Sequence, residues 1–272
     1  MQDRVLTSVV THEYFNQARV MIKSFLRYNE GYDVVLFADD DIGLEGVETV
    51  SINEPKFERK DVVKFSRIEM IRAQCHLELL ERGYKSVLYC DSDIYFTRTF
   101  PLYAKSVFTP HHIDSVGKCN PRWIMDDGFF NIGIYWLVND EATITFLKIL
   151  DMMSQKLEKG YNTKPSGDAY WQQCLYNYLP LFHRDYIMCN DVGINVAYWN
   201  LKERGILTYN DGQYYIGGDI PLICYHFSHW SRKEVMSKYD RSSVKGLGAC
   251  ARLYNEYSTM LEKEKKIQSE YK

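Results

Sequence analysis

The chain reads Lys85-Ser86-Val87-Leu88-Tyr89-Cys90-Asp91-Ser92-Asp93-Ile94-Tyr95-Phe96 near the end of its first third. Residues 86–90 have the continuous apolar character of a buried central strand. Asp91 and Asp93 follow directly, and two carboxylates this close repel each other unless a cation or protons intervene. Carboxylate oxygens are ligands that suit Mg²⁺ or Mn²⁺. The segment therefore predicts a metal site at the end of a buried strand.

Strand-like and helix-like runs alternate on the N-terminal side of this segment. Apolar runs predict strands at 5–10, 34–38 and 47–52, and apolar residues at helical spacing predict helices at 18–26 and 61–82. This alternation predicts an α/β fold with a mainly parallel central sheet that is flanked by helices.

Polar clusters follow three of the predicted strands, at 11–13, 39–41 and 91–93. Ligands of such sheets bind beyond the carboxyl ends of the strands. We therefore expect these clusters to meet in one crevice.

The second half of the chain is less regular. It predicts strands at 129–138 and 222–227, helices at 141–159 and 168–178, and a charged C-terminal helix at 249–271. No linker or repeat separates it from the first half, so we expect a single domain over residues 1–272.

Composition limits the functions that the chain can have. Its 272 residues carry a formal net charge of −3, which disfavours nucleic acid as a partner. Aromatic residues reach 15%, which favours either a bulky core or a site that stacks sugars or bases. The seven cysteines include no CxxC pair and read as buried thiols in a reducing compartment. No run of 18 apolar residues predicts a transmembrane segment, so we expect a cytoplasmic protein.

Five segments in this order resemble the GT-A fold glycosyltransferases that use nucleotide-sugar donors, and among them the family 8-like enzymes. They are Val9-Val10-Thr11-His12-Glu13-Tyr14, Lys64-Phe65-Ser66-Arg67, Asp91-Ser92-Asp93, Phe129-Phe130-Asn131-Ile132-Gly133 and His226-Phe227-Ser228. The resemblance extends over residues 5–233. It implies a catalytic domain with a nucleotide-binding half at 1–95, a sugar and acceptor half at 96–248, and a C-terminal helix at 249–272.

The resemblance also implies a metal site and a donor. Asp91, Asp93 and His226 would hold Mn²⁺ or Mg²⁺, with His229 as a rival for His226 and with Asp91 also near the ribose. A divalent cation stabilises the negative charge that grows on a departing diphosphate. The donor would be a nucleotide sugar, and a UDP-sugar is the expected one.

Further residues are implied to contact the donor. Thr11 and Tyr14 would meet the nucleoside, Asn131 would line the sugar pocket, and Lys233, or Arg232 beside it, would meet the diphosphate. For two positions, Arg67 and Asn131, the sequence leaves two roles open. Arg67 would pair with a phosphate or a sugar-pocket acid, or lie on the surface. The amide of Asn131 would bond a sugar hydroxyl or the backbone.

At the reacting face the chain departs from the family's pattern, in which the Asp and the Gln are adjacent. Asp168 and Gln172 lie one helical turn apart and are the candidate catalytic residues, although Asp168 is also a plausible N-cap. The alternative candidates for this role are Asp126, Asp127 and Asp191. The segment Asn195-Val196-Ala197-Tyr198-Trp199-Asn200 reads either as a sugar or acceptor wall or as ordinary packing.

The leading hypothesis is a metal-dependent, retaining glycosyltransferase. Its acceptor would be a hydroxyl of a glycan, a lipid-linked sugar or a protein, and it would act in the cytoplasm or at the inner face of the membrane. One alternative is a non-catalytic sugar-nucleotide or glycan-binding protein with a relict fold. The other is an Asp-dependent phosphohydrolase, which Ile94-Tyr95-Phe96 after the acidic motif disfavours.

Overall fold

The structure is a computed structural model that describes residues 2–52, 71–112, 128–158, 173, 175–228 and 247–270. The chain divides into two compact units, and each is described by itself. The first comprises Met1–His12, Gly31–Cys90 and Tyr103–Cys189. The second comprises Glu13–Glu30, Asp91–Leu102 and Asn190–Lys272. The expectation of one catalytic domain stays a prediction.

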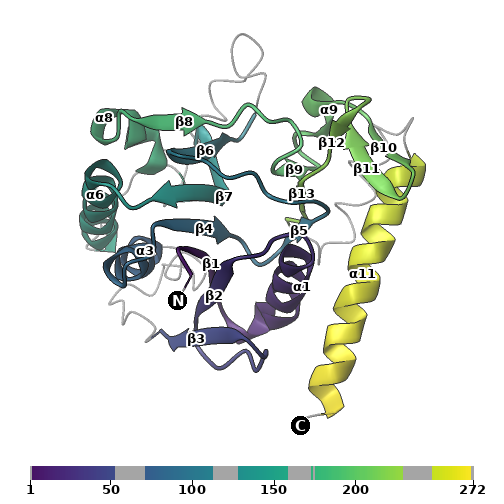
Figure 1. The fold of residues 1–272 in the computed structure, drawn as a ribbon, viewed down its shortest axis with the longest axis horizontal. Coiled ribbons are helices and arrows are strands. Elements are labelled where there is room, and N and C mark those ends of the chain that lie inside the picture. The colour runs from purple at the N-terminus through teal and green to yellow at the C-terminus, as the bar shows by residue number, and fades with distance from the viewer. Residues whose placement is uncertain are drawn as a thin grey trace. The chain divides into compact units, whose positions relative to one another are not determined.

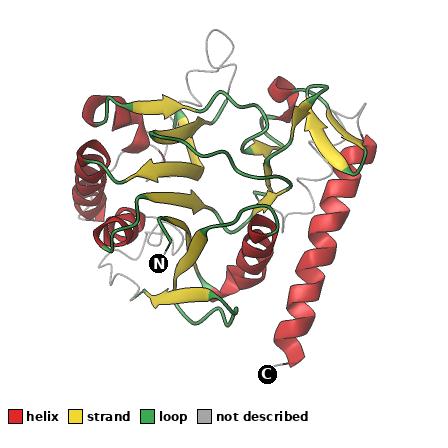
Figure 2. Ribbon diagram, viewed as in Figure 1, coloured by secondary structure: helices red, strands yellow, loops and turns green. Residues whose placement is uncertain are grey.

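The first unit is built on a seven-stranded sheet with the order β3-β2-β1-β4-β7-β6-β8 (Figures 1 and 2). The strands are β1 (Arg4–Val10), β2 (Tyr32–Ala38), β3 (Val47–Ser51), β4 (Ser86–Cys90), β6 (Ser106–Pro110), β7 (Phe130–Val138) and β8 (Tyr186–Met188). Strands β3, β2, β1 and β4 run parallel, and β7 is antiparallel to both of its neighbours. The predicted α/β fold with a mainly parallel sheet is confirmed.

One face of this sheet is covered by helices α3 (Arg72–Glu81) and α6 (Glu141–Glu158). Successive side chains of a strand point to opposite faces, and the strand register brings Val5, Val87 and Leu137 into one row on this face. These residues and Leu79 of α3 are fully buried in the same apolar cluster. The cluster fixes the sheet on which the carboxyl ends of β1 and β4 are presented.

Helix α3 ends as the sequence predicts. Gly83 has a φ of +98°, a left-handed conformation that glycine adopts without strain. Its N–H donates to Leu80 at 3.1 Å, and the next N–H, of Tyr84, reaches Leu79 at 3.4 Å. The chain therefore turns directly from α3 into β4.

The second unit contains two three-stranded sheets. One has the order β5-β13-β9, and the other has the order β10-β11-β12. The strands are β5 (Ile94–Phe96), β9 (Val196–Ala197), β10 (Leu207–Asn210), β11 (Gln213–Ile216), β12 (Ile220–Pro221) and β13 (Cys224–His226). The helices are α1 (Phe15–Leu26), α9 (Leu201–Arg204) and α11 (Leu247–Glu270). Only β13 and the two long helices of this unit correspond to predicted elements.

The C-terminal helix α11 packs into the core of this unit, as the periodicity of its apolar residues predicts. Leu253, Tyr257 and Leu261 are buried, and Met260 packs against the same cluster. On the polar side, the Lys23 ammonium of α1 lies 2.6 Å from Glu264. The helix is therefore a structural part of the second unit.

Other predictions fall partly outside the described residues. The helix expected at 61–82 is described from residue 71, and most of the helix expected at 168–178 is not described, although a short 3₁₀ helix covers Tyr176–Tyr178. The five cysteines that the structure describes are buried and form no disulfide, as expected. Among the described helices, none has the length and apolar character needed to cross a bilayer.

Candidate active site

Two paired strands of the second unit carry the acidic motif and the late histidine. The turn Asp91-Ser92-Asp93 leads into β5, and it is closed by the Ile94 N–H, which donates to the Asp91 carbonyl at 3.2 Å. Strand β13 pairs antiparallel with β5, so His226 lies opposite Ile94. The N–H of Phe227 then donates to the Asp93 carbonyl at 2.9 Å. The backbone thereby holds His226 beside the two acids.

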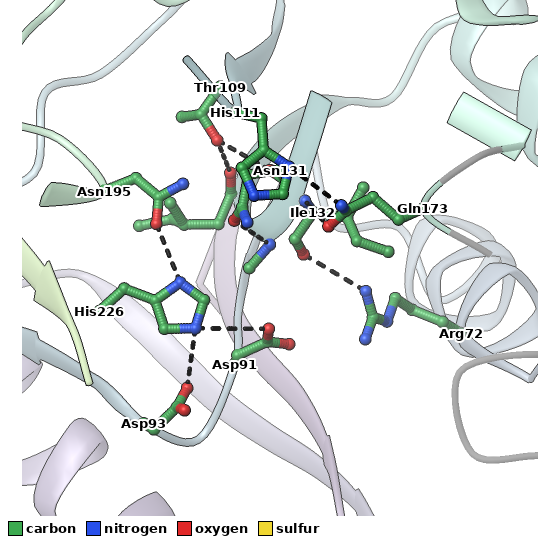
Figure 3. Close-up of polar contacts among 12 residues, drawn as sticks. Arg72, Asp91, Asp93, Thr109, His111, Asn131, Ile132, Gln173, Asn195 and His226 are labelled. Atoms are coloured by element: carbon green, nitrogen blue, oxygen red, sulfur yellow. Dashed lines mark hydrogen bonds and ion pairs between the residues drawn. The ribbon is translucent and has the colours of Figure 1, made fainter. Parts of the chain in front are cut away.

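The three side chains converge (Figure 3). The Nε2 atom of His226 lies 3.1 Å from Asp93 Oδ1 and 3.9 Å from Asp91 Oδ2. One ligand atom from each of the three residues lies within 4.8 Å of the other two. Neighbouring ligands of an octahedral ion, each about 2.1 Å from it, are separated by about 3 Å. The distance from His226 to Asp93 matches this separation, and the donor set of two carboxylates and one imidazole suits a divalent cation.

The ring of His226 is oriented from its other side by Asn195 (Figure 3). The Asn195 Oδ1 atom lies 3.1 Å from His226 Nδ1. Because an amide oxygen only accepts, Nδ1 carries the proton of this bond. In the neutral ring, Nε2 is then the nitrogen with a lone pair, on the side of the carboxylates. The Trp199 ring packs edge-to-face against the imidazole, with the two ring centroids 5.1 Å apart.

Asn195 is itself held in an uncommon backbone conformation. It is fully buried and has a φ of +58°, which asparagine tolerates better than most residues. Its carbonyl accepts from Asn200 Nδ2 at 2.9 Å. Arg204 donates from Nη1 to the carbonyls of Val192 and Ile194 at 2.9 and 2.6 Å. These bonds fix the loop that carries the histidine's partner.

The electrostatics of the site favour a positive charge. Burial acts first on His226 and lowers its pKa, but the carboxylates of Asp93 and Asp91 outweigh this effect and leave the pKa above its ordinary value of 6.5. The carboxylates thus favour a positive charge beside Nε2. A divalent cation bound there would need this nitrogen deprotonated, as every metal ligand must be.

A second polar group lies in the first unit, around the irregular pairing of β6 with β7 (Figure 3). Asn131 is buried, and its Oδ1 accepts from the N–H of Gly133 at 3.0 Å. The Thr109 hydroxyl lies 2.9 Å from the Asn131 carbonyl. The side-chain oxygen of Asn131 therefore has the backbone partner that was one of its two expected alternatives.

Three further side chains approach the same strand. Gln173 accepts from the Ile132 N–H at 3.4 Å, and its Nε2 lies 3.1 Å from His111 Nδ1. Arg72 donates to the Ile132 carbonyl at 3.3 Å, and its guanidinium lies 4.3 Å from the centre of the Tyr89 ring. Arg72 of α3 and Gln173 thus both form hydrogen bonds to the backbone of β7, in the first unit, and His111 contacts Gln173.

The first predicted polar cluster, residues 11–13, lies at the carboxyl end of β1. Thr11 is buried, and His12 binds Asp39 at the end of the neighbouring strand β2 through its N–H at 2.7 Å and its Nδ1 at 3.0 Å. Tyr14 follows in the second unit, with 39% of its surface exposed. The carboxyl ends of β1 and β2 therefore meet as expected.

Several predicted site residues lie outside the described residues. They are Arg67, Asp126, Asp127, Asp168, Gln172, His229, Arg232 and Lys233. Asp191, the one alternative catalytic candidate that the structure describes, accepts a hydrogen bond from the Gly193 N–H at 2.8 Å in a local turn. The roles of all these residues stay predictions.

Sequence reasoning missed three residues of these groups. Gln173 stands beside the predicted Gln172, and Arg72 stands in the predicted helix, so neither carried a signal of its own. His111 follows a short strand that was not predicted. Asn195 was singled out only within a sugar or acceptor wall, because its pairing with His226 depends on the contact of β9 with β13.

Comparison with known proteins connects these groups to a family. The nucleotide-diphospho-sugar transferase family matches residues 46–166. No curated protein matches the chain in sequence.

Solved structures of glycosyltransferases are similar to this chain. A galactosyltransferase, LgtC, in complex with donor and acceptor sugar analogs, is 11% identical over 95% of both chains, with a TM-score of 0.57. GlyE of Streptococcus pneumoniae is 16% identical over 71% of this chain, with a TM-score of 0.43, and this chain spans 46% of its length. A glycosyltransferase involved in the glycosylation of the major capsid of PBCV-1 is 14% identical over 88% of this chain and 98% of its own, with a TM-score of 0.48.

These findings confirm the predicted resemblance at the level of fold, and the family match over residues 46–166 agrees with it. The likeness to LgtC extends over nearly the whole chain and supports the fold. The family match supports the predicted transferase role, and the acidic motif at 91–93 lies within the matched segment. The chain thus has the GT-A glycosyltransferase fold, and its residues 46–166 match the nucleotide-diphospho-sugar transferase family.

Proposed function

We propose that this chain is a metal-dependent glycosyltransferase that moves a sugar from a nucleotide-diphospho-sugar to a hydroxyl acceptor. The observation that carries the proposal is the convergence of Asp91, Asp93 and His226. Two carboxylates and one imidazole at this spacing suit Mn²⁺ or Mg²⁺. The family match of the surrounding sequence points to a diphosphate as the group that such an ion meets.

The metal ion, when bound, would supply Lewis-acid stabilisation of the negative charge on the departing diphosphate. Asp93 and His226 would bind it through Oδ1 and Nε2, and Asp91 would complete the protein's share of the ligands. Asn195 would keep the proton on Nδ1, so that Nε2 stays a ligand atom.

Further residues are proposed contacts of the donor. Thr11 lies at the carboxyl end of β1, where a nucleoside binds in sheets of this kind. We assign Asn131, with its neighbours Gln173 and His111, to the sugar, because amides and imidazoles form hydrogen bonds to hydroxyl groups. Tyr14, Arg67 and Lys233 remain the proposed further contacts of the nucleotide.

The finer features of the reaction rest on the resemblance alone. We propose a UDP-sugar as the donor and retention of the anomeric configuration, as in family 8-like enzymes. Asp168 and Gln172 are the proposed residues of the reacting face. We further propose a glycan, lipid-linked or protein hydroxyl as the acceptor and action in the cytoplasm, or at the inner face of a membrane.

Donor hydrolysis tests the proposal without knowledge of the acceptor. The full chain is incubated with each of several UDP-sugars and Mn²⁺, and released UDP is measured. We expect slow hydrolysis of one donor, its loss in EDTA, and its restoration by added Mn²⁺.

Two results would contradict the proposal. Binding of a UDP-sugar with no hydrolysis and no transfer to any tested glycan would favour a non-catalytic binding protein. Undiminished hydrolysis in excess EDTA would remove the metal from the mechanism.

A further inference from the structure

A cavity lies in the second unit, and Asp91, Asp93 and His226 do not line it. It has a volume of about 730 Å³. Its walls come from β5 and the residues after it, from the hairpin β10–β11, from the end of α1 and from α11. A volume of this size is within the range of small-molecule sites.

Four tyrosines are among the residues that line the cavity: Tyr28, Tyr95, Tyr209 and Tyr214. Tyr209 and Tyr214 of the hairpin have ring centroids 4.8 Å apart. Tyr95 is buried against Tyr257 of α11, at 5.9 Å between centroids, and is fixed there. Tyr28 is 37% exposed. Aromatic rings offer flat apolar faces with polar rims, a surface on which the C–H face of a sugar ring packs.

Planar polar groups stand beside these rings. The Arg252 guanidinium lies 3.9 Å from the centre of the Tyr209 ring and donates from Nε to Glu256 at 3.0 Å. Arg252 is half exposed and so is in reach of a ligand. Guanidinium and carboxylate groups each present two or more parallel hydrogen-bonding positions, which match the paired hydroxyls of a sugar. The amide side chains of Gln213 and Asn255 complete this part of the lining.

The charged groups beside these rings form an ion pair, which favours a neutral ligand at this part of the cavity. Arg252 is paired with Glu256, and the carboxylate would repel a phosphate or a nucleotide. The lining also includes Arg27. The Tyr95 hydroxyl stays uncharged, because burial first, and then the nearby Glu256, raises the pKa of Tyr95 to about 12. This hydroxyl can therefore donate as well as accept hydrogen bonds.

The cavity and the acidic motif share a strand. Tyr95 comes two residues after Asp93, and it pairs with Tyr225 on β13 one residue before His226. A ligand in the cavity would thus be held by the same small sheet that positions the proposed metal ligands.

We propose that this cavity binds a neutral oligosaccharide. The bound saccharide would be the part of a glycan acceptor that does not react. This acceptor role rests on the proposed function, whereas saccharide binding by the cavity does not.

Direct binding tests the proposal independently of catalysis. The full chain is titrated in EDTA, without any donor, with lactose, maltotriose, chitotriose and mannotriose, and binding is followed by saturation-transfer NMR and calorimetry. We expect at least one of these saccharides to bind, with an affinity that Mn²⁺ does not change.

Variants locate the site. Tyr28→Ala and Glu256→Gln should each lower the affinity at least tenfold. The matched control is Tyr178→Ala, which removes a tyrosine that is 46% exposed and belongs to the first unit. It should leave the affinity unchanged. Melting temperatures of all variants show that they are folded.

Three outcomes would overturn the proposal: no binding of any saccharide, equal binding by wild type and both cavity variants, or tighter binding of inorganic phosphate than of the saccharides. None of these bears on Mn²⁺-dependent donor hydrolysis. Conversely, if the chain bound a saccharide but hydrolysed no donor, the cavity proposal would stand and the proposed transferase activity would be rejected.

Discussion

Replacement of Asn195 by glycine tests how the site holds its histidine. Asn195 has a φ of +58°, and its Oδ1 lies 3.1 Å from His226 Nδ1. Glycine adopts this φ without strain. Asn195→Gly therefore removes the amide that orients the imidazole and leaves the backbone conformation accessible.

The expected effect is a loss of metal affinity. Removal of a hydrogen-bond partner behind a metal-binding histidine weakens metal binding by about 10–100-fold, which corresponds to about 1.4–2.7 kcal/mol. The Asn195 hydrogen bond is fully buried, so water does not replace it readily. Asn195→Asp should keep most of the affinity, because a carboxylate also accepts from Nδ1.

Calorimetric titration of the full chain with Mn²⁺ at pH 7.5 measures this effect. The matched control is Asp211→Gly, which makes the same kind of change at the other described non-glycine residue with positive φ, 50°, in the turn between β10 and β11. The reasoning is refuted if Asn195→Gly binds Mn²⁺ as tightly as wild type, or if Asp211→Gly weakens it equally.

Three further changes test the base contact, the core and the pH dependence. Tyr14→Ala should weaken UDP binding by about 1–3 kcal/mol if the ring stacks on the base; unchanged affinity in a calorimetric titration would exclude this. Leu253→Ala, at a fully buried position of α11, should lower the free energy of unfolding by about 2–5 kcal/mol, while the exposed control Lys263→Ala should not; equal urea midpoints would contradict the packing. Burial first, and then Arg72, lowers the pKa of His76 from 6.5 to about 3. Below pH 6.5 the unfolded chain therefore binds a proton that the folded chain does not, and by pH 5 this costs about 2 kcal/mol of stability. His76→Phe should lose less stability than wild type between pH 7 and pH 5, and an equal loss in urea titrations would be evidence against a neutral His76.

The central sheet could be predicted from the sequence because its signals are local. Residues 86–90 form a strand with the predicted bounds, since continuous apolar character reflects burial on both faces. Gly83 ends α3 as expected, because the required positive φ suits glycine. The helix α11 follows its apolar periodicity within two residues at its start.

The rest of the site depends on contacts between distant segments. Asn195 meets His226 only because β9 pairs with β13, and this pairing involves strands of two and three residues with no clear alternation of their own. His111 follows β6, a strand of five buried residues that ends in a proline and was not predicted. Such short elements form because tertiary packing stabilises them, and local propensity does not reveal them.

The measurement that tests the central claim most directly is the binding of UDP to the full chain with and without Mn²⁺, for wild type and Asp93→Asn. Asp93 Oδ1 lies 3.1 Å from His226 Nε2, so the amide variant keeps the shape of the site but removes one negative charge. The account predicts that wild type binds UDP at least tenfold more tightly with Mn²⁺, and that Asp93→Asn loses this gain while its melting temperature without metal is little changed. Equal UDP affinity with and without Mn²⁺ in wild type, or an undiminished Mn²⁺ effect in Asp93→Asn, would contradict it.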